Sequence, residues 1–180
     1  MNALIVIDVQ NDYFVGGAWP QFQAAETAAR IADCVRVADA AGDLVVAVRH
    51  MNAADAAMLA AGSAGAAFYP ALAPLLADRP TVDKRAADAF WQTDLARILT
   101  AAGVSDIYLC GMMTQNCITH TALSPDAAAW RVHIIVSQNK KDTRQRAADS
   151  THVRQGEITP YIFYLGSLYL FVLAHYKKAA

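Results

Sequence analysis

Several features that would assign this chain to an obvious class are scarce or missing from its 180 residues. It has only three cysteines, Cys34, Cys110 and Cys117, and no two of them show C-x-x-C spacing, so neither a disulfide framework nor a zinc knuckle is predicted. A net charge of −1 and a pI near 6.5 leave no basic excess for a nucleic-acid partner. The first ten residues lack the basic flank and cleavage site of a signal peptide, so we expect a cytoplasmic protein.

The sequence does contain enough apolar residues for one domain with a sizeable core, because 56% of the chain is hydrophobic and 17% is charged. Short apolar runs typical of buried strands alternate with helical patterns, and these runs cover residues 3–9, 44–48, 81–84, 106–110 and 132–136. The clearest helical pattern covers residues 24–41 and ends at Gly42, whereas residues 51–77 predict a long loop with one or two helical turns. The alternation predicts an α/β fold with a parallel sheet covered on both faces.

Three chemically capable side chains follow three of these predicted strands. Asp8, Lys84 and Cys117 come after the first, third and fourth strands, and ligands of parallel sheets bind beyond these carboxyl ends. Each residue also has an ordinary explanation, since such an Asp often caps a loop, a Lys is often solvated and a Cys is often a small core residue. Cys117 lies in the first turn of a predicted helix, where the helix dipole favours the thiolate. Their convergence at one edge favours a catalytic site.

The chain resembles the isochorismatase-like cysteine hydrolases in three blocks. These blocks read IVIDVQNDY, DKRAADAFWQTDL and CGMMTQNC, at residues 5–13, 83–95 and 110–117, and the likeness extends over residues 3–136. The resemblance implies a three-layer α/β/α sandwich with a mainly parallel, Rossmann-like central sheet. It also implies a catalytic triad of Asp8, Lys84 and Cys117, a cis peptide between Met112 and Met113, and a homo-oligomer.

The chemistry implied by this triad is hydrolysis of a small amide C–N bond through an acyl-thioester. Asp8 would act as general base, Lys84 as a fixed positive charge, and Cys117 as nucleophile. The backbone N–H groups of Met113 and Cys117 would receive the oxyanion. Two alternatives remain open, which are hydrolysis of a vinyl ether as in isochorismatases that typically lack the cysteine, and an inactive family member that serves in binding.

The substrate and the metal content depend on fewer residues. Aromatic side chains beside the triad positions are candidates for a substrate pocket, although they are equally typical of the core: Tyr13, Phe14, Phe90 and Trp91. The segment RHMNAAD offers His50 and Asp55 where nicotinamidases of the family carry an Asp-Trp-His metal element, with no second histidine nearby. We therefore predict no metal and no other cofactor, and disfavour nicotinamide as the substrate.

The end of the chain departs from the family pattern. Pro125 should end the helix that carries Cys117, and residues 137–138 read Ser-Gln where members commonly show Asp-Ala. Residues 158–176 are aromatic and apolar without any Asp, Glu, Lys or Arg. We predict a single domain over residues 1–180 with an atypical segment at 137–180, which is a last element of the domain, a subunit interface, a membrane anchor or a tail altered by a frame change.

Overall fold

A computed structural model describes residues 1–135 and 151–153, and it places one sheet between two layers of helices. The strand order is β3-β2-β1-β4-β5-β6. The first five strands pair in parallel and β6 pairs antiparallel to β5. The strands are β1 (Asn2–Ile7), β2 (Leu44–His50), β3 (Thr81–Lys84), β4 (Asp106–Gly111), β5 (Arg131–Ile134) and β6 (Thr151–Val153). The predicted α/β architecture is confirmed.

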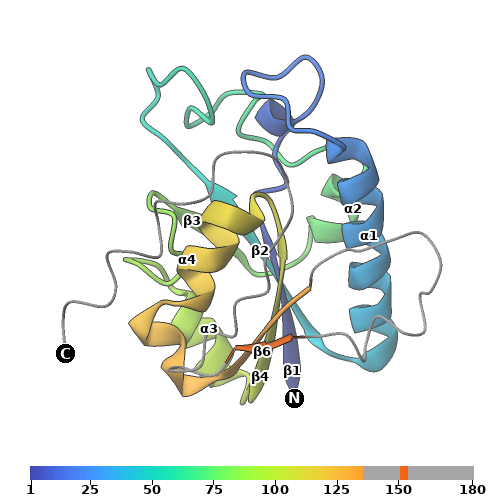
Figure 1. Cartoon of the computed structure of the whole chain (residues 1–180), viewed down its shortest axis with the longest axis vertical. Coiled ribbons are helices and arrows are strands. Elements are labelled where there is room, and N and C mark those ends of the chain that lie inside the picture. The colour runs from blue at the N-terminus through green and yellow to red at the C-terminus, as the bar shows by residue number, and fades with distance from the viewer. Residues whose placement is uncertain (136–150, 154–180) are drawn as a thin grey trace.

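The helices divide between the two faces of the sheet (Figure 1). The α-helices are α1 (Ala24–Ala41), α2 (Ala73–Leu76), α3 (Leu95–Ala101) and α4 (Thr119–Ala122). Short irregular turns are η1 (Asn11–Tyr13), η2 (Thr114–Ile118) and η3 (Pro125–Ala129). In Figure 1, α1 and α2 lie on one side of the strands, and α3 and α4 lie on the other. This is the three-layer sandwich that the resemblance implies.

Alternation along β1 creates the two hydrophobic cores. Leu4 and Val6 pack in the cluster that contains the buried face of α1, whereas Ile5 and Ile7 pack in the cluster that contains Leu99 of α3. Side chains of a strand point to opposite faces in turn, so an uninterrupted apolar run such as ALIVI fits a strand covered on both faces. Burying both faces fixes the register of β1 and therefore the place where the chain leaves the sheet.

The predicted boundaries hold within a few residues. The helix over residues 24–41 is confirmed, and Gly42 follows it in the left-handed conformation with φ 71°. Within the loop predicted over residues 51–77, only the single turn of α2 is helical. The helix that follows Cys117 stops at Ala122, before a 3-10 turn that begins at Pro125, as predicted.

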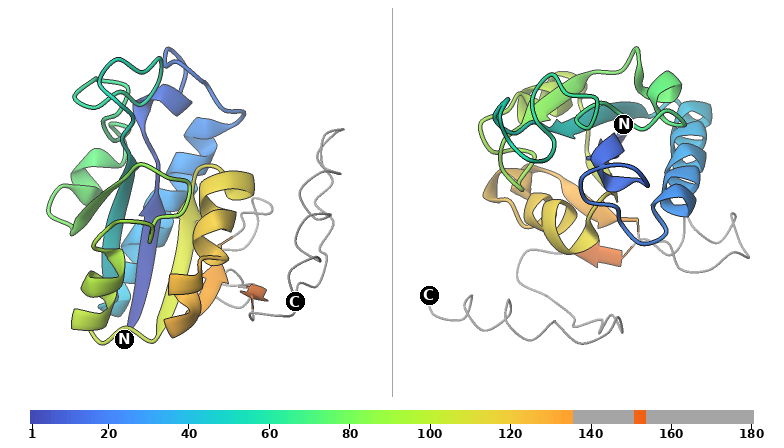
Figure 2. Two further views of the ribbon diagram at one scale, coloured as in Figure 1. Left: turned by 90° about the vertical axis from the view of Figure 1, so that its left-hand side faces the viewer. Right: turned by 90° about the horizontal axis from the view of Figure 1, so that it is seen from above.

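The loops after β1 and β2 gather at one end of the sheet (Figure 2). This end is formed by the carboxyl ends of the five parallel strands, so it positions the candidate site. No helix in the described ranges is long and apolar enough to cross a membrane. Residues 136–150 and 154–180 lie outside the described residues, and so the predictions about the atypical C-terminal segment and the single domain stay predictions.

Candidate active site

Asp8 is placed by a sharp exit of the chain from β1. Its backbone is in the left-handed region with φ 55°, which is rare for a residue with a side chain. Its N–H donates to the Val48 carbonyl at 2.9 Å, and the Met112 N–H donates to the Ile7 carbonyl at 2.9 Å. A Cβ atom at Gly111 would collide with the Ile7 carbonyl, so only glycine fits where β4 passes this exit. The Asp8 side chain is fully buried as a result.

Lys84 ends β3 and is also fully buried. Along this strand Val82 and Lys84 point inward, while Thr81 and Asp83 point outward. The Asp83 carboxylate binds the Arg49 guanidinium at 2.8 Å on the outer side, so it takes no part in the inner cluster. Strand alternation therefore selects the lysine of the Asp-Lys pair as the residue that reaches the site.

Cys117 completes the triad from the segment after β4, which lies on the other side of β1 from β3 in the sheet. It lies in η2, a π-helical turn that follows a cis peptide between Met112 and Met113, as the resemblance implies. The Lys84 Nζ lies 2.8 Å from the Asp8 Oδ2 and 3.2 Å from the Cys117 Sγ. A carboxylate oxygen of Asp8 and the Cys117 Sγ lie within 4.8 Å of each other. The structure thus brings the three predicted catalytic side chains together.

The charge state of Cys117 differs from the sequence-based expectation. The pKa of its thiol is raised to about 12, first by burial and then by the negative charge of Asp8, while Lys84 acts in the other direction. The expected preference of the helix start for a thiolate is therefore wrong for the free thiol, because burial and the adjacent carboxylate outweigh the helix dipole. Burial also raises the pKa of Asp8, although Lys84 acts in the other direction. Both shifts favour proton exchange between the two groups over loss of a proton to water.

The backbone before Cys117 offers an oxyanion site. Within residues 1–135 the Met113 N–H donates no hydrogen bond, while the Met113 carbonyl accepts from Asn116 at 3.0 Å. An unpaired backbone donor costs free energy unless a ligand or water receives it. Met113 therefore suits the predicted role. The role of the Cys117 N–H stays a prediction.

The four aromatic candidates for a substrate pocket occupy different environments. Phe14 stacks on Tyr69 with ring centroids 3.5 Å apart, and Phe90 stacks on Trp130 at 5.5 Å, so both rings pack in the cores. Trp91 is 58% exposed. Tyr13 is buried, and its phenol pKa is raised by burial and then by the negative charges of Asp8 and Cys117. Among the four, Tyr13 is electrostatically coupled to the triad, and a substrate role for all four stays a prediction.

Sequence reasoning named His50 only as a possible metal ligand, and it assigned no role beside the triad to Gln10 or Asn52. The buried Gln10 donates its amide to the His50 and Ala66 carbonyls at 2.9 and 2.7 Å and accepts from the His50 N–H at 2.8 Å. The His50 Nδ1 lies 3.1 Å from the Lys84 Nζ, and its Nε2 lies 2.9 Å from the Asn52 Oδ1. A lone histidine at a strand end and a lone asparagine after it carry no spacing signal, which explains why their contacts with Lys84 and with each other were not predicted.

Asp12 supports the loops above the site. Its carboxylate accepts hydrogen bonds from the Ala18 N–H at 3.1 Å and from the Leu59 N–H, and its own N–H donates to the Gly65 carbonyl at 3.0 Å. A side chain at Gly65 would occupy the place of this carboxylate. Asp12 therefore joins the loop that follows β1 to the loop that follows β2.

The cluster is a poor fit for a metal ion. Asp8, His50 and Cys117 offer ligand-type atoms within 4.8 Å of one another. The Lys84 Nζ, however, lies between 2.8 and 3.2 Å from all three side chains. An ammonium group already neutralises this position and would repel a second cation. The expectation that the protein needs no metal stays a prediction.

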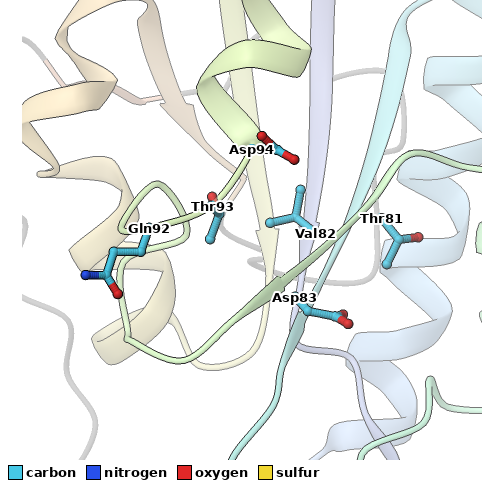
Figure 3. A pocket seen from close by; sticks show the side chains of 6 residues that line it. All are labelled: Thr81, Val82, Asp83, Gln92, Thr93 and Asp94. Carbon is cyan, nitrogen blue, oxygen red and sulfur yellow. The ribbon is translucent and has the colours of Figure 1, made fainter.

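A separate hollow lies on the outer side of β3 (Figure 3). Its lining comprises Thr81, Val82, Asp83, Gln92, Thr93 and Asp94. Four of its polar side chains already have partners, since Asp83 binds Arg49, Asp94 binds Arg97, and the Thr93 and Thr81 hydroxyls donate to the Ala89 and Arg79 carbonyls at 2.6 and 3.1 Å. The hollow contains none of the triad side chains and is not the candidate site.

Comparisons with known proteins show which family the chain is similar to. The isochorismatase family protein YddQ of Bacillus subtilis (strain 168) is 33% identical over 128 residues, covering 68% of each chain. A streptothricin hydrolase of Streptomyces noursei is 33% identical over 122 residues, which are 68% of this chain and 43% of that protein. A crystal structure of nicotinamidase from Bacillus subtilis matches with a TM-score of 0.66 and 26% identity, over 74% of this chain and 82% of the other. The Isochorismatase domain family matches residues 2–138, and the chain belongs to that family.

Proposed function

We propose that the protein is a cysteine-dependent hydrolase that cleaves the C–N bond of a small amide through an acyl-thioester. One observation carries the proposal, which is that the buried Lys84 Nζ lies within hydrogen-bond distance of both the Asp8 carboxylate and the Cys117 Sγ. Such an arrangement couples a base, a nucleophile and a fixed cation.

In the acylation step Asp8 takes the thiol proton of Cys117, and the Sγ attacks the amide carbonyl carbon. Transfer from thiol to carboxylate leaves the total charge of the triad unchanged, so burial opposes it less than it opposes ionisation into water. The raised pKa of Asp8 makes it a stronger base, and a thiolate from a weakly acidic thiol is a stronger nucleophile. Forming the S–C bond places negative charge on the carbonyl oxygen, toward the Met113 N–H.

Collapse of the tetrahedral intermediate breaks the C–N bond and returns the proton from Asp8 to the leaving amine. In the second step Asp8 takes a proton from water, and the resulting hydroxide attacks the thioester carbon. The thiolate leaves, the carboxylic acid product forms, and the proton held by Asp8 returns to the Cys117 Sγ. Lys84 stays protonated and compensates whichever partner carries negative charge.

Amide hydrolysis is favoured over the alternatives by the side chains and by the names of the relatives. Cleavage of a vinyl ether needs no nucleophilic thiol, whereas here Cys117 contacts the lysine of the triad. Streptothricin hydrolase and nicotinamidase are among the similar proteins. Nicotinamide itself is disfavoured, because His50 is engaged with Lys84 and Asn52 and the cluster fits an ammonium better than a metal.

The test is release of ammonia or amine from a panel of small amides by the wild-type protein and by Cys117→Ala and Cys117→Ser. We expect turnover of at least one amide by the wild type and none by Cys117→Ala, with circular dichroism confirming that both variants fold. Hydroxylamine should intercept the acyl-thioester as a hydroxamate only when Cys117 is present. Retained amide turnover in Cys117→Ala would rule out the thioester route.

A further inference from the structure

Lys84 has more acceptors around its ammonium group than it has protons. Its Nζ lies 2.8 Å from the Asp8 Oδ2, 3.0 Å from the Ala86 carbonyl, 3.1 Å from the His50 Nδ1 and 3.2 Å from the Cys117 Sγ. An ammonium group carries three N–H donors and no lone pair. Four neighbours therefore share three protons, and one neighbour is left without a hydrogen bond at any moment.

The protonation of His50 follows from its two neighbours. Lys84 can only donate, so the His50 Nδ1 must accept and a neutral imidazole carries its proton on Nε2. That Nε2–H then donates to the Asn52 Oδ1 at 2.9 Å. The orientation of Asn52 is fixed in turn, because its Nδ2 donates to the Met58 carbonyl at 3.0 Å. Burial and the charge of Lys84 lower the pKa of His50, in agreement with a neutral ring.

We propose that His50 is a positioning residue. Its Nδ1 accepts the hydrogen bond of the third Lys84 N–H while Cys117 is a thiol, and this N–H turns to the sulfur when the thiolate forms. The inference rests on the proposed function, since it assigns a step to the same site. No proton leaves the Lys84 Nζ. One hydrogen bond is exchanged for another as the charge moves from the Asp8 carboxylate to the Cys117 sulfur.

The order of acceptor strength supports this exchange. A thiol sulfur is a weak acceptor, so in the resting state the three N–H groups of Lys84 donate to the Asp8 carboxylate, the Ala86 carbonyl and the His50 imidazole. A thiolate is charged and accepts a stronger hydrogen bond than a neutral imidazole does. His50 thus stabilises the resting thiol and keeps Cys117 unreactive until a substrate makes the thiolate useful. Gln10, which binds the backbone of His50 on both sides, holds the ring in place.

Few other charged or titratable groups face this exchange. Within residues 1–135, Asp8 after β1 and Tyr13 in η1 are coupled to Cys117, and Lys84 reaches it from β3. Arg49, the neighbour of His50 on β2, pairs with Asp83 on the outer side. A change at His50 should therefore act on Cys117 through Lys84.

The test measures alkylation of Cys117 against pH, followed for each cysteine peptide by mass spectrometry. His50→Leu removes the acceptor of the Lys84 hydrogen bond, whereas His50→Gln keeps an acceptor. Both variants replace the imidazole ring by a flexible side chain of similar length. We expect the thiol pKa to fall by about one unit in His50→Leu, which raises the alkylation rate at a given pH about threefold because the lower pKa also weakens the nucleophile. His50→Gln should stay near the wild type.

Asn52→Leu gives a second test with the imidazole in place. Without the Asn52 oxygen the ring can carry its proton on Nδ1, so Cys117 should react faster than in the wild type and more slowly than in His50→Leu. Asn11→Ala is the control, because Asn11 also donates a side-chain amide to a loop carbonyl, that of Ala64 at 2.8 Å, without contacting the triad. It should leave the rate of Cys117 unchanged.

The buried Cys110 reports on folding in the same samples, since it should stay slow in every folded variant. If Cys110 reacts fast in His50→Leu, that variant is not folded, and the alkylation rate of Cys117 in Asn52→Leu then tests the proposal. An unchanged or slower Cys117 in the folded leucine variants would overturn the proposal. Alkylation needs no substrate, so the two proposals can fail separately. Failure of every amide in the panel would reject the proposed function and leave the alkylation rates valid. Unchanged alkylation rates would reject the role of His50 and leave the proposed function standing.

Discussion

Two buried carboxylates at opposite ends of the same sheet have contrasting surroundings. Asp8 leaves the carboxyl end of β1, and Asp106 begins β4 at the other end. Within residues 1–135, the Asp8 carboxylate pairs with the Lys84 ammonium, and no backbone N–H donates to it. Asp106 accepts from the Arg131 guanidinium, from the Ser105 hydroxyl at 2.8 Å and lies 3.1 Å from the His133 Nε2.

The two environments shift the two pKa values in opposite directions. Burial raises the pKa of Asp8, whereas the Arg131 hydrogen bond, with help from Ser105 and His133, holds the pKa of Asp106 well below its usual range. A carboxylate surrounded by donors is stabilised as an anion and serves the fold. A buried carboxylate with few donors is ready to accept a proton, which suits a general base. The contrast teaches that burial alone does not distinguish a structural acid from a reactive one.

The strongest way to break the contrast is Lys84→Met, which leaves Asp8 buried without a cation. We expect a loss of about 3 to 5 kcal/mol in the free energy of unfolding at neutral pH. The folded-state pKa of Asp8 lies above its unfolded value, so this cost is full at high pH and shrinks as falling pH protonates the carboxylate. Chemical denaturation at neutral and mildly acidic pH measures it.

Arg49→Met is the matched control for Lys84→Met. Arg49 of β2 and Asp83, the neighbour of Lys84 on β3, form a partly exposed ion pair, so its loss should cost less than about 1 kcal/mol. Equal costs for the two variants would show that burial of the Lys84 pair has no special energetic weight.

A second variant, Asp8→Asn, separates reactivity from turnover. Removing the base should lower turnover of a responsive amide by about 10²- to 10⁴-fold. Removing the negative charge should also lower the thiol pKa of Cys117, so that iodoacetamide reacts faster with the inactive variant. Steady-state assays and alkylation rates check both parts, and near-normal turnover would exclude Asp8 as the base.

A smaller effect than those of Lys84→Met and Asp8→Asn is expected from Asp106→Asn at the other end of the sheet. Its charge-assisted hydrogen bonds should contribute about 2 kcal/mol at neutral pH, with amide turnover unchanged. The folded-state pKa of Asp106 is depressed, so this contribution is present above the ordinary carboxyl range near pH 4 and is lost as pH falls toward the folded pKa. The free energy of unfolding, measured by chemical denaturation, should therefore change less with pH in acid for the variant than for the wild type.

The positions of Asp8, Lys84 and Cys117 were predictable because they depend only on where the strands end along the sequence and on the strands being parallel. Each residue follows a strand of a parallel sheet, and the carboxyl ends of such strands meet at one edge. Helical periodicity predicted the helix over residues 24–41, and Pro125 predicted the end of the helix that follows Cys117. Local pattern and global fold agree in these elements.

The electrostatics of the site were not predictable from the sequence. The raised pKa of Cys117 depends on burial and on the distance to Asp8, and neither quantity has a local sequence signal. The contact between His50 and Lys84 joins residues 34 positions apart and depends on the register of β2 and β3. Packing rather than pattern therefore decides which side chains tune the nucleophile.

The Asp12 carboxylate bears on how the substrate range of this protein can be changed. Because Asp12 joins the loop after β1, at Ala18, to the loop after β2, at Leu59 and Gly65, altering the length of one loop strains the anchor of the other. Loop grafting from a relative with a different substrate should therefore transfer these segments together with their aspartate. The triad beneath them can then remain in place.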